Sequence, residues 1–580
     1  MASFSHYKQN FNLFIRDLEL KISTPIFRRL GLIIPLLFFL IVVIMPIAFL
    51  FASVILEWGE VSRWIFTDEI LQDRMWQISL TAIIRSFQIA TIVTIIDLLI
   101  GIPAALILAR LNFPGKSIID TLIDIPMAVP TSALGFSIFL FWGRSDGFAS
   151  LFGLQTGILN NDPFPLLIIA AHVAFSYPYI VRSVKAVIEE INVDLEMASR
   201  TLGAPSMTTF RTVTAPLMKE AIVAGAILSF TRSLGETGAT YIVSGIYETA
   251  PIIVVSWVKT LRIPAAAFLS MLLVAIAIFL LLCLRLFARY VGLPIQRIWV
   301  RPERLLSGKW QSRTRNFLVF SIFFIVVLIP SLFVLYYLFL WLFNSPYTGD
   351  PTAGALYQVF LASDRKWISL WTSFITSLQV ATLVTVINLV FGIPMAFIIV
   401  RKRNEWGKIS DLLDAIVDIP LVIPSSALGF SAYLFWGFNG INLFFPGFYL
   451  IVLTHVLMTY PFCVRPLVAV IEQIPPEYEE AAFTLGAPAF RVFHSVTLPI
   501  MKTGILSAGI MIFTRSLSET GATLIVMGLD RTIPVMIIDW VESGFSLPAA
   551  ALASAILILL SCALILLLRQ IPEETGGTGE

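Results

Sequence analysis

Two pairs of oppositely charged residues lie inside apolar stretches, and they are the first candidates for a functional site. Arg232 is followed four positions later by Glu236, and Arg515 and Glu519 repeat that spacing. Residues four apart share one face of a helix. An unpaired charge at the bilayer centre costs roughly 2.5–3.5 kcal/mol on insertion scales, so such charges usually pair or face water. Two interpretations are open: a structural ion pair, or a polar solute pathway shared with Thr237, Thr240, Thr520 and Thr523.

Two further motifs combine aspartate with prolines. Asp124-Ile-Pro126 and Asp418-Ile-Pro420 are each followed four residues later by another proline, Pro130 or Pro424. Proline interrupts the helical hydrogen-bond ladder, and broken helices at membrane depth occur where they are buried in protein or line a cavity. These motifs predict pathway-lining or hinge elements, with kinked packing as the alternative.

The equivalent histidines His172 and His455 lie in the fourth apolar stretch of each half of the chain. Their position favours a polar contact between helices over a proton relay.

No residue pattern for covalent or metal chemistry is visible. The nearest approach to the phosphate-binding pattern G-x-x-x-x-G-K-[ST] is Gly115-Lys116-Ser117, but Arg110 stands where the first glycine is required. The three cysteines, which lie in or near apolar stretches, lack metal-ligand spacing. The sequence therefore predicts no metal, no cofactor and no enzyme activity in this chain, so any ATP must be hydrolysed by another protein.

The amino-acid composition is that of a membrane protein, so we expect these motifs to lie within a membrane. Of 580 residues, 58% are apolar and 13% are charged, whereas soluble domains average about 45–50% and about 25%. The net charge of +2 gives no indication of nucleic-acid binding. About twelve stretches are long enough to span a bilayer: 31–56, 80–109, 118–143, 164–186, 219–240, 265–288, 316–343, 371–400, 411–437, 447–469, 502–523 and 548–569.

Basic residues predict the orientation of these spans, because loops rich in Lys and Arg stay in the cytoplasm. If the spans alternate, the basic loops after residues 109 and 400 fall on the side of the N-terminus, as does the linker 291–315. The opposite side carries acidic residues such as Asp68, Glu69 and Asp350. We therefore expect a multi-pass protein of the cytoplasmic (inner) membrane with both termini in the cytoplasm.

The chain contains one unit twice. Residues 86–103 match 377–394, and residues 124–143 match 418–437. Each half has an even number of spans, so the copies run parallel about a pseudo-two-fold axis along the membrane normal. The prediction is an all-α polytopic fold with about twelve transmembrane helices in two repeats. Its expected divisions are an N-terminal segment 1–30, a first repeat 31–290, a basic linker 291–315, a second repeat 316–570 and a tail 571–580.

A polar segment is also repeated before the fifth span of each half. The first copy lies within residues 189–218 and contains EMASRTLGAPSMTTFRTVTAP, and the second lies within residues 472–501 and contains EEAAFTLGAPAFRVFHSVTLP. We call these the first and second Gly-Ala-Pro segments. Glu and Ala favour a helix, Gly486 allows a sharp turn, and Pro488 can open a second short helix. An amphipathic connector on the membrane surface is the alternative.

The second copy resembles the EAA loop of binding-protein-dependent ABC importer permeases, and each half resembles one such permease with an extra N-terminal span. The Arg-Ser-Leu-x-Glu-Thr-Gly-Ala-Thr stretches at 232–240 and 515–523 are similar to the branch that serves sulfate, molybdate, tungstate, ferric iron or thiamine. The resemblance implies coupling helices that dock two copies of a nucleotide-binding ATPase subunit, which carries ATP and Mg. The implied docking residues are Glu196, Ala198, Gly203, Ala204, Glu479, Glu480, Ala481, Ala482, Gly486 and Ala487.

The first copy departs from the pattern, because Met197 stands where the family has the glutamate that aligns with Glu480. We therefore expect the second segment to bind the ATPase more strongly.

The resemblance implies an ATP-driven importer, with both membrane halves in one chain, that receives a small polar solute from an extracytoplasmic solute-binding protein. Oxyanion, ferric ion and thiamine all remain open as substrates. An ion- or proton-coupled secondary transporter with internal repeats is the alternative function. A membrane enzyme is disfavoured because no catalytic set is visible.

Overall fold

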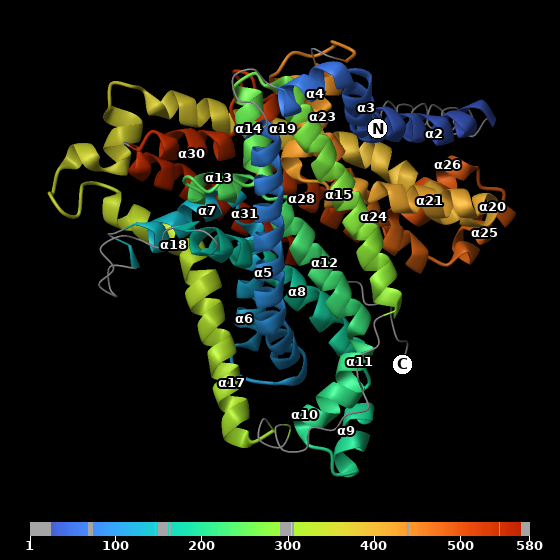
Figure 1. Cartoon of the computed structure of the whole chain (residues 1–580). Helices are drawn as coiled ribbons and strands as arrows, with labels where there is room; N and C mark the ends of the chain where they lie inside the picture. The colour runs from blue at the N-terminus through green and yellow to red at the C-terminus, as the bar shows by residue number, and fades with distance from the viewer. Residues whose placement is uncertain are drawn as a thin grey trace, which may run out of the picture.

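A computed structural model describes residues 25–67, 74–144, 147–148, 160–161, 164–290, 303, 307–437, 440–544 and 546–569 (Figure 1). Most of the predicted segment 1–30, the loop residues Asp68 and Glu69, most of the linker 291–315 and the tail 571–580 lie outside this range. The described residues form helices and one short antiparallel pair, β1 (Asn160–Asn161) with β2 (Phe164–Pro165). The all-helical prediction is confirmed.

Eight predicted spans are unbroken helices long and apolar enough to cross a membrane. Within the described residues these run over Arg29–Leu56, Met75–Arg110, Leu166–Glu190, Ile263–Leu280, Trp310–Trp341, Lys366–Arg401, Phe448–Gln473 and Leu547–Leu564. They correspond to α2 (Pro25–Phe38) through α3 (Met45–Leu56), α5 (Arg74–Arg110), α8 (Leu166–Glu190) and α15 (Ile263–Tyr290) in the first half. In the second half they are α17 (Lys309–Ile322) through α18 (Ile329–Trp341), α19 (Lys366–Arg401), α24 (Phe448–Gln473) and α31 (Leu547–Arg569).

The third predicted span of each half is a bent pair of helices, and a second bend precedes the fifth predicted span. The third spans are α6 (Lys116–Ala128) with α7 (Thr131–Ile138), and α21 (Lys408–Val417) and α22 (Ile419–Val422) with α23 (Ser425–Trp436). They bend by 103° and 107°, respectively. Pro130 and Pro424 are the N-cap residues after the bends. Because proline disfavours a helical conformation in the residue before it, these prolines account for the predicted breaks.

The bends that precede the fifth spans lie where the Gly-Ala-Pro segments end. Both bends measure 72° and precede α12 (Lys219–Leu234) and α28 (Lys502–Leu517). The segments themselves comprise α9 (Val193–Thr201), α10 (Ser206–Thr209), η4 (Phe210–Thr214) and α11 (Ala215–Leu217), and then α25 (Pro476–Thr484), α26 (Ala489–Val492), η8 (Phe493–Thr497) and α27 (Leu498–Ile500).

Four π-helical turns each precede a proline. They are η1 (Phe39–Ile44), η4, η5 (Phe323–Leu328) and η8, and the next helix carries a proline within its first two residues in every case. A proline clashes with the carbonyl four residues earlier and has no N–H to donate. A widened π turn accommodates that clash without ending the span.

Short helices that the sequence analysis did not predict precede the last span of each half. They are α13 (Gly238–Val243) and α14 (Ala250–Lys259) in the first half, and α29 (Thr523–Val526) and α30 (Ile533–Glu542) in the second. Their apolar residues, including Val254 and Val535, are buried. Ten residues are too few to register as a membrane span.

The two halves exchange their outer spans. The first span of the first half, α2 to α3, packs on α19, α24 and α23 of the second half, and α17 to α18 packs on α5, α8 and α7 of the first. Figure 1 shows α17 beside α5 and α6. One hydrophobic core joins Val43 and Leu269 with Tyr460, and the other joins Tyr177 with Phe323 and Leu557. Neither half therefore buries its apolar faces alone.

Candidate functional site

Each Gly-Ala-Pro segment folds as two short helices joined by a tight turn. The Asn192 side chain caps α9 by accepting a hydrogen bond from the Asp194 N–H at 2.9 Å. Gly203 (φ +88°) and Gly486 (φ +80°) adopt the left-handed conformation at the turns, which favours glycine because a side chain would be strained there. The predicted helix–turn–helix form is therefore present twice. In Figure 1 the two segments lie at separate extremities of the molecule, α9–α10 at the bottom and α25–α26 at the right.

Glu196 and Glu479 point into the protein rather than away from it. Glu196 is 8% exposed, and its Oε1 accepts hydrogen bonds from Arg110 at 3.3 Å and from the Thr214 hydroxyl at 3.1 Å. Arg110 also donates to the Ile191 carbonyl at 2.9 Å. These contacts fix the first segment to the end of α5.

The second segment repeats the arrangement. Glu479 accepts from Arg401 at 3.2 Å and from the Thr497 hydroxyl at 3.1 Å. Arg401 in turn donates to the Ile474 carbonyl at 3.0 Å. The arginine was recognised in the sequence only as a topology signal, because its partner lies nearly 80 residues further along the chain.

The outer surface of each segment is partly apolar. Met197 is 55% exposed and Leu202 is 89% exposed in the first segment, and Leu485 is 88% exposed in the second. Glu480, the counterpart of Met197, is also exposed. The other predicted docking residues divide between exposed Ala198, Gly203, Ala481 and Gly486 and partly buried Ala204, Ala482 and Ala487. Each turn thus presents a leucine beside a glycine.

Two residues of the linker contact the first segment. The Arg211 Nε donates to Glu303 at 2.6 Å, and the Thr208 hydroxyl donates to the same carboxylate. The Ser307 hydroxyl accepts from the Met207 N–H at 3.0 Å. The second segment has His494 at the position of Arg211, and its ring stacks on Phe490. The two segments therefore have different surroundings.

The intramembrane charged residues pair as predicted, but the predicted continuous helix is wrong. Arg232 pairs with Glu236, and Arg515 pairs with Glu519 at 2.7 Å. The helices α12 and α28 end at Leu234 and Leu517, so both glutamates lie in the break that follows.

Each of these glutamates has a second structural partner. Glu236 accepts from the Ala239 N–H at 3.1 Å, and Glu519 accepts from the Ala522 N–H at 3.2 Å. Free backbone N–H groups beyond the break need acceptors, and a carboxylate supplies one. The pair therefore joins the end of one helix to the start of the next.

The two Thr-Gly stretches meet at the interface of the halves. A Cβ on Gly521 would lie 2.5 Å from the Thr237 Cβ, and a Cβ on Gly238 would lie 2.7 Å from the Thr520 Cβ. The Thr237 hydroxyl also lies 3.5 Å from the Ser425 hydroxyl at the start of α23. The predicted threonines Thr237 and Thr520 thus pack across the pseudo-two-fold axis, in close contact with the opposite half.

The other two threonines, Thr240 and Thr523, contact the equivalent histidines His172 and His455. His172 has Nδ1 2.8 Å from the Ser233 hydroxyl and Nε2 2.8 Å from the Thr240 hydroxyl. His455 has the same two contacts at 2.9 Å, with Ser516 and Thr523. The predicted polar contact between helices is present in both halves, and it ties α8 and α24 to both sides of the breaks after α12 and α28.

An accessible stripe leads along α12 to Arg232. Ala224, Leu228 and Arg232 are spaced by four residues and lie on one helix face, and Leu228 is 41% exposed. The Arg232 side chain is 21% exposed, whereas that of its partner Glu236 is 3% exposed. A Cβ on Gly235, three residues after Arg232, would lie 3.1 Å from the Pro424 Cα of the other half. The end of the stripe at Arg232 therefore faces the second half of the chain.

The second half has the same stripe on α28. Ser507, Met511 and Arg515 follow the same four-residue spacing, and Met511 is 38% exposed. The Arg515 side chain is 24% exposed and that of Glu519 is 5% exposed.

Asp124 and Asp418 take part in ion pairs that the sequence analysis missed. The Arg182 Nε donates to Asp124 at 2.6 Å, and its Nη1 donates to Asp120 at 2.8 Å. Arg465 contacts Asp418 at 2.5 Å and Asp414 at 2.6 Å in the same way. These bonds hold α6 on α8 and α21 on α24. Pro126 and Pro420 lie within the helices before the bends.

Asp97 is a buried carboxyl group that the sequence analysis overlooked. It is fully buried in the middle of α5, where its Oδ2 accepts from the hydroxyls of Ser176 at 2.5 Å and Ser229 at 2.7 Å. The matching residue Asn388 donates instead to the Thr459 hydroxyl at 2.7 Å. The sequence signal that could have revealed this buried site was a single aspartate inside the apolar stretch 86–103.

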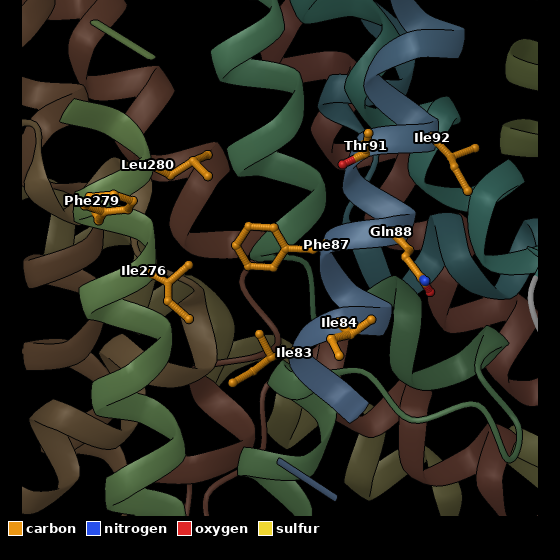
Figure 2. A pocket seen from close by; sticks show the side chains of 9 residues that line it. All are labelled: Ile83, Ile84, Phe87, Gln88, Thr91, Ile92, Ile276, Phe279 and Leu280. Atoms are coloured by element: carbon orange, nitrogen blue, oxygen red, sulfur yellow. The ribbon is translucent and has the colours of Figure 1, made fainter. Parts of the chain in front are cut away.

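An open groove on the surface of α5 and α15 is unsuited to a polar solute. It has a volume of about 670 Å³ and lies between α5 and α15, where Ile83 and Phe87 face Ile276 and Leu280 (Figure 2). Its lining is apolar except for Gln88 and Thr91. Within the described part of the chain, no group of three or more His, Cys, Asp or Glu residues could hold a metal ion.

Comparison with known proteins finds one family in both halves. The profile of the family described as "Binding-protein-dependent transport system inner membrane component" matches residues 101–293 and 388–573. A probable sulfate transport system permease protein cysT of Chlorokybus atmophyticus is 31% identical over 227 residues, which cover 37% of this chain and 77% of the relative.

Two prokaryotic relatives give similar figures. The molybdenum transport system permease protein ModB of Escherichia coli K12 is 34% identical over 171 residues, or 30% of this chain and 72% of ModB. The molybdate/tungstate transport system permease protein WtpB of Methanocaldococcus jannaschii is 31% identical over 204 residues, or 35% of this chain and 78% of WtpB. Each of these matches therefore covers about a third of the present chain, less than the length of one half.

These matches bear out the resemblance and do not favour the secondary-transporter alternative. The ATPase of such an importer lies in a separate subunit. This chain belongs to the family of binding-protein-dependent transport system inner membrane components, as a fused double permease of an ABC importer.

Proposed function

We propose that this chain forms the membrane pathway for a small tetrahedral oxyanion of the sulfate, molybdate or tungstate type. The observation that carries the proposal is the asymmetric exposure of the two charged pairs. The side chains of Arg232 and Arg515 are 21% and 24% exposed, while those of their partners Glu236 and Glu519 are 3% and 5% exposed. A solute that follows the accessible stripes on α12 and α28 meets guanidinium groups first.

This arrangement favours an anion over ferric ion or thiamine. A guanidinium group presents N–H donors in a fork that matches the oxygens of an oxyanion. A cation would require exposed carboxylates, but both glutamates are turned away and also bind backbone N–H groups. The names of the relatives, which refer to sulfate, molybdenum and molybdate/tungstate, also favour an oxyanion as the solute.

We infer that two copies of an ATPase subunit dock on the Gly-Ala-Pro segments from the cytoplasm. Each segment presents an exposed leucine beside a left-handed glycine, Leu202 with Gly203 and Leu485 with Gly486. Small and apolar residues allow close approach to a partner surface. The inward ion pairs with Arg110 and Arg401 would transmit motion of a segment to α5 and α19.

Alternating access would then open and close the contact between the Thr-Gly stretches. The N-terminal end of α12 follows the first Gly-Ala-Pro segment, and sixteen helical residues at about 1.5 Å each place the break roughly 24 Å further into the membrane. In the orientation with both termini in the cytoplasm, the contact of Thr237 with Gly521 closes the side that faces the solute-binding protein.

Uptake into proteoliposomes tests the proposal. The chain is reconstituted with its ATPase subunit and its cognate solute-binding protein, and ATP-driven uptake of radiolabelled sulfate, molybdate, ferric ion and thiamine is compared. We expect uptake of one or more oxyanions, and no uptake of the two cations. Ferric ion or thiamine as the transported solute would overturn the substrate, while uptake without ATPase would overturn the coupling.

A further inference from the structure

A pocket of about 450 Å³ lies between the two halves of the chain, beside the first Gly-Ala-Pro segment. Its walls come from α5, from α9 to η4, and from α17 of the second half. It therefore exists only because α17 packs on the opposite half.

Part of the pocket lining is charged. Arg110, Arg200 and Arg315 line it together with the carboxylate of Glu196. Arg110 forms an ion pair with Glu196 at 3.3 Å, so these two charges offset each other. Arg200 and Arg315 are both exposed, and Arg315 has polar contacts to the neutral side chains of Asn316 and Ser312. The pocket thus carries an excess of two positive charges.

The wall that α5 contributes is apolar as far as Arg110 and follows the membrane-spanning part of that helix. Leu98, Ile102 and Leu106 form this wall over roughly two helical turns. A second groove of about 500 Å³, between α5 and α17, shares Leu99, Pro103 and Arg315 with the pocket. The two hollows therefore place the apolar wall of α5 next to Arg315.

We propose that this pocket binds one anionic phospholipid, with its phosphate between Arg200 and Arg315 and an acyl chain along the apolar wall of α5. Basic pockets between transmembrane helices on the cytoplasmic side suit anionic head groups. The inference takes its membrane orientation from the proposed function. A soluble anion would use the arginines but would leave the apolar wall exposed, so the combination of charge and apolar depth favours a lipid.

The corresponding place in the second half lacks this chemistry. Phe483 occupies the position of Arg200, Ala489 that of Ser206 and Phe490 that of Met207. A single anionic lipid per chain therefore follows from the sequence difference. The bound lipid would connect α17 of one half to the first Gly-Ala-Pro segment of the other, and would make the two segments unequal.

Native mass spectrometry of the purified full-length chain tests the site without ATPase or transport substrate. The protein is titrated with an equal mixture of phosphatidylglycerol and phosphatidylcholine. We expect one phosphatidylglycerol to bind in preference to phosphatidylcholine. Each basic residue near an anionic surface contributes about fivefold, so R200Q/R315Q should lower that preference about 30-fold.

R313Q is the matched control, because Arg313 lies two positions before Arg315 on α17, is exposed, and does not line the pocket. It should keep the wild-type preference. Equal loss in R313Q and R200Q/R315Q, or no loss in R200Q/R315Q, would overturn the site. Displacement of phosphatidylglycerol by millimolar inorganic phosphate would overturn the lipid as occupant. Because the measurement needs no transport, it can succeed even if the proposed oxyanion pathway is wrong.

Discussion

Thr237 of the first half packs directly on Gly521 of the second, so closely that a Cβ on the glycine would lie 2.5 Å from the threonine Cβ. Thr520 and Gly238 make the reciprocal contact. Real side chains do not approach to that distance, so glycine is required at both positions for the halves to meet in this conformation. The breaks after α12 and α28 bring these stretches together.

A methyl group at either glycine should therefore separate the halves. G238A and G521A force backbone or side-chain shifts that typically cost about 1–3 kcal/mol, and we expect a lower thermal unfolding temperature together with reduced ATP-driven uptake. G509A is the control, because a Cβ there would lie 3.6 Å from the Leu389 side chain, at ordinary contact distance. Equal unfolding temperatures for G521A and G509A would contradict the close contact.

The charged pairs can be separated into structural and pathway roles by a double substitution. R515A leaves the buried Glu519 without its cation, and breaking a buried pair costs about 3–5 kcal/mol. E519Q in addition removes the unpaired charge but keeps an acceptor for the Ala522 N–H, so R515A/E519Q should regain much of the thermal stability. If the arginine only holds the helices together, uptake recovers with stability. If Arg515 meets the solute, uptake stays low, and we expect the second result.

Glu480 and Glu196 should affect the ATPase partner in different ways. E480A removes an exposed charge, so it should weaken co-purification of the ATPase subunit without changing thermal stability. E196A removes the acceptor of Arg110 inside the protein, so it should lower thermal stability with a smaller loss of co-purification. M197E supplies the missing exposed carboxylate and should strengthen association at the first segment. The same loss of ATPase in E480A and E196A would contradict the assignment.

The polar site around Asp97 should accept an amide but not an apolar residue. D97N reproduces the side chain found at Asn388, and we expect thermal stability within about 1 kcal/mol of wild type because hydrogen bonds to Ser176 and Ser229 can persist. D97L leaves the buried Ser229 hydroxyl without its acceptor, at about 1–3 kcal/mol for an unsatisfied group, whereas the Ser176 hydroxyl can still donate to the His172 carbonyl at 2.6 Å. Thermal unfolding of the two variants in detergent decides the point; a D97N protein as unstable as D97L would indicate that the carboxyl itself is required.

Sequence reasoning located the spans well because hydrophobicity is a local property. The breaks at Pro130 and Pro424 were also predictable, since the effect of proline acts on its own helix. The position of Glu236 beyond the end of a helix could not be predicted from the sequence. Nothing local indicates that α12 ends at Leu234 and that the glutamate then binds the Ala239 N–H.

Ion pairs across spans escaped the sequence analysis for a related reason. Arg182 with Asp120, and Arg110 with Glu196, join residues 62 and 86 positions apart. Their spacing carries no periodic signal. The direction of Glu196 was therefore unknown, and the sequence assigned it to a docking surface when the carboxylate is in fact buried.

By itself the sequence determined that this is a duplicated, all-helical membrane protein with repeated Gly-Ala-Pro segments, because apolar length, proline position and internal similarity can all be read along the chain. Only the tertiary structure decided that the halves exchange their outer spans, that Thr237 meets Gly521, and that Arg232 is more accessible than Glu236. These relationships depend on which helices pack together, and many pairings of apolar helices are compatible with the same pattern of residues.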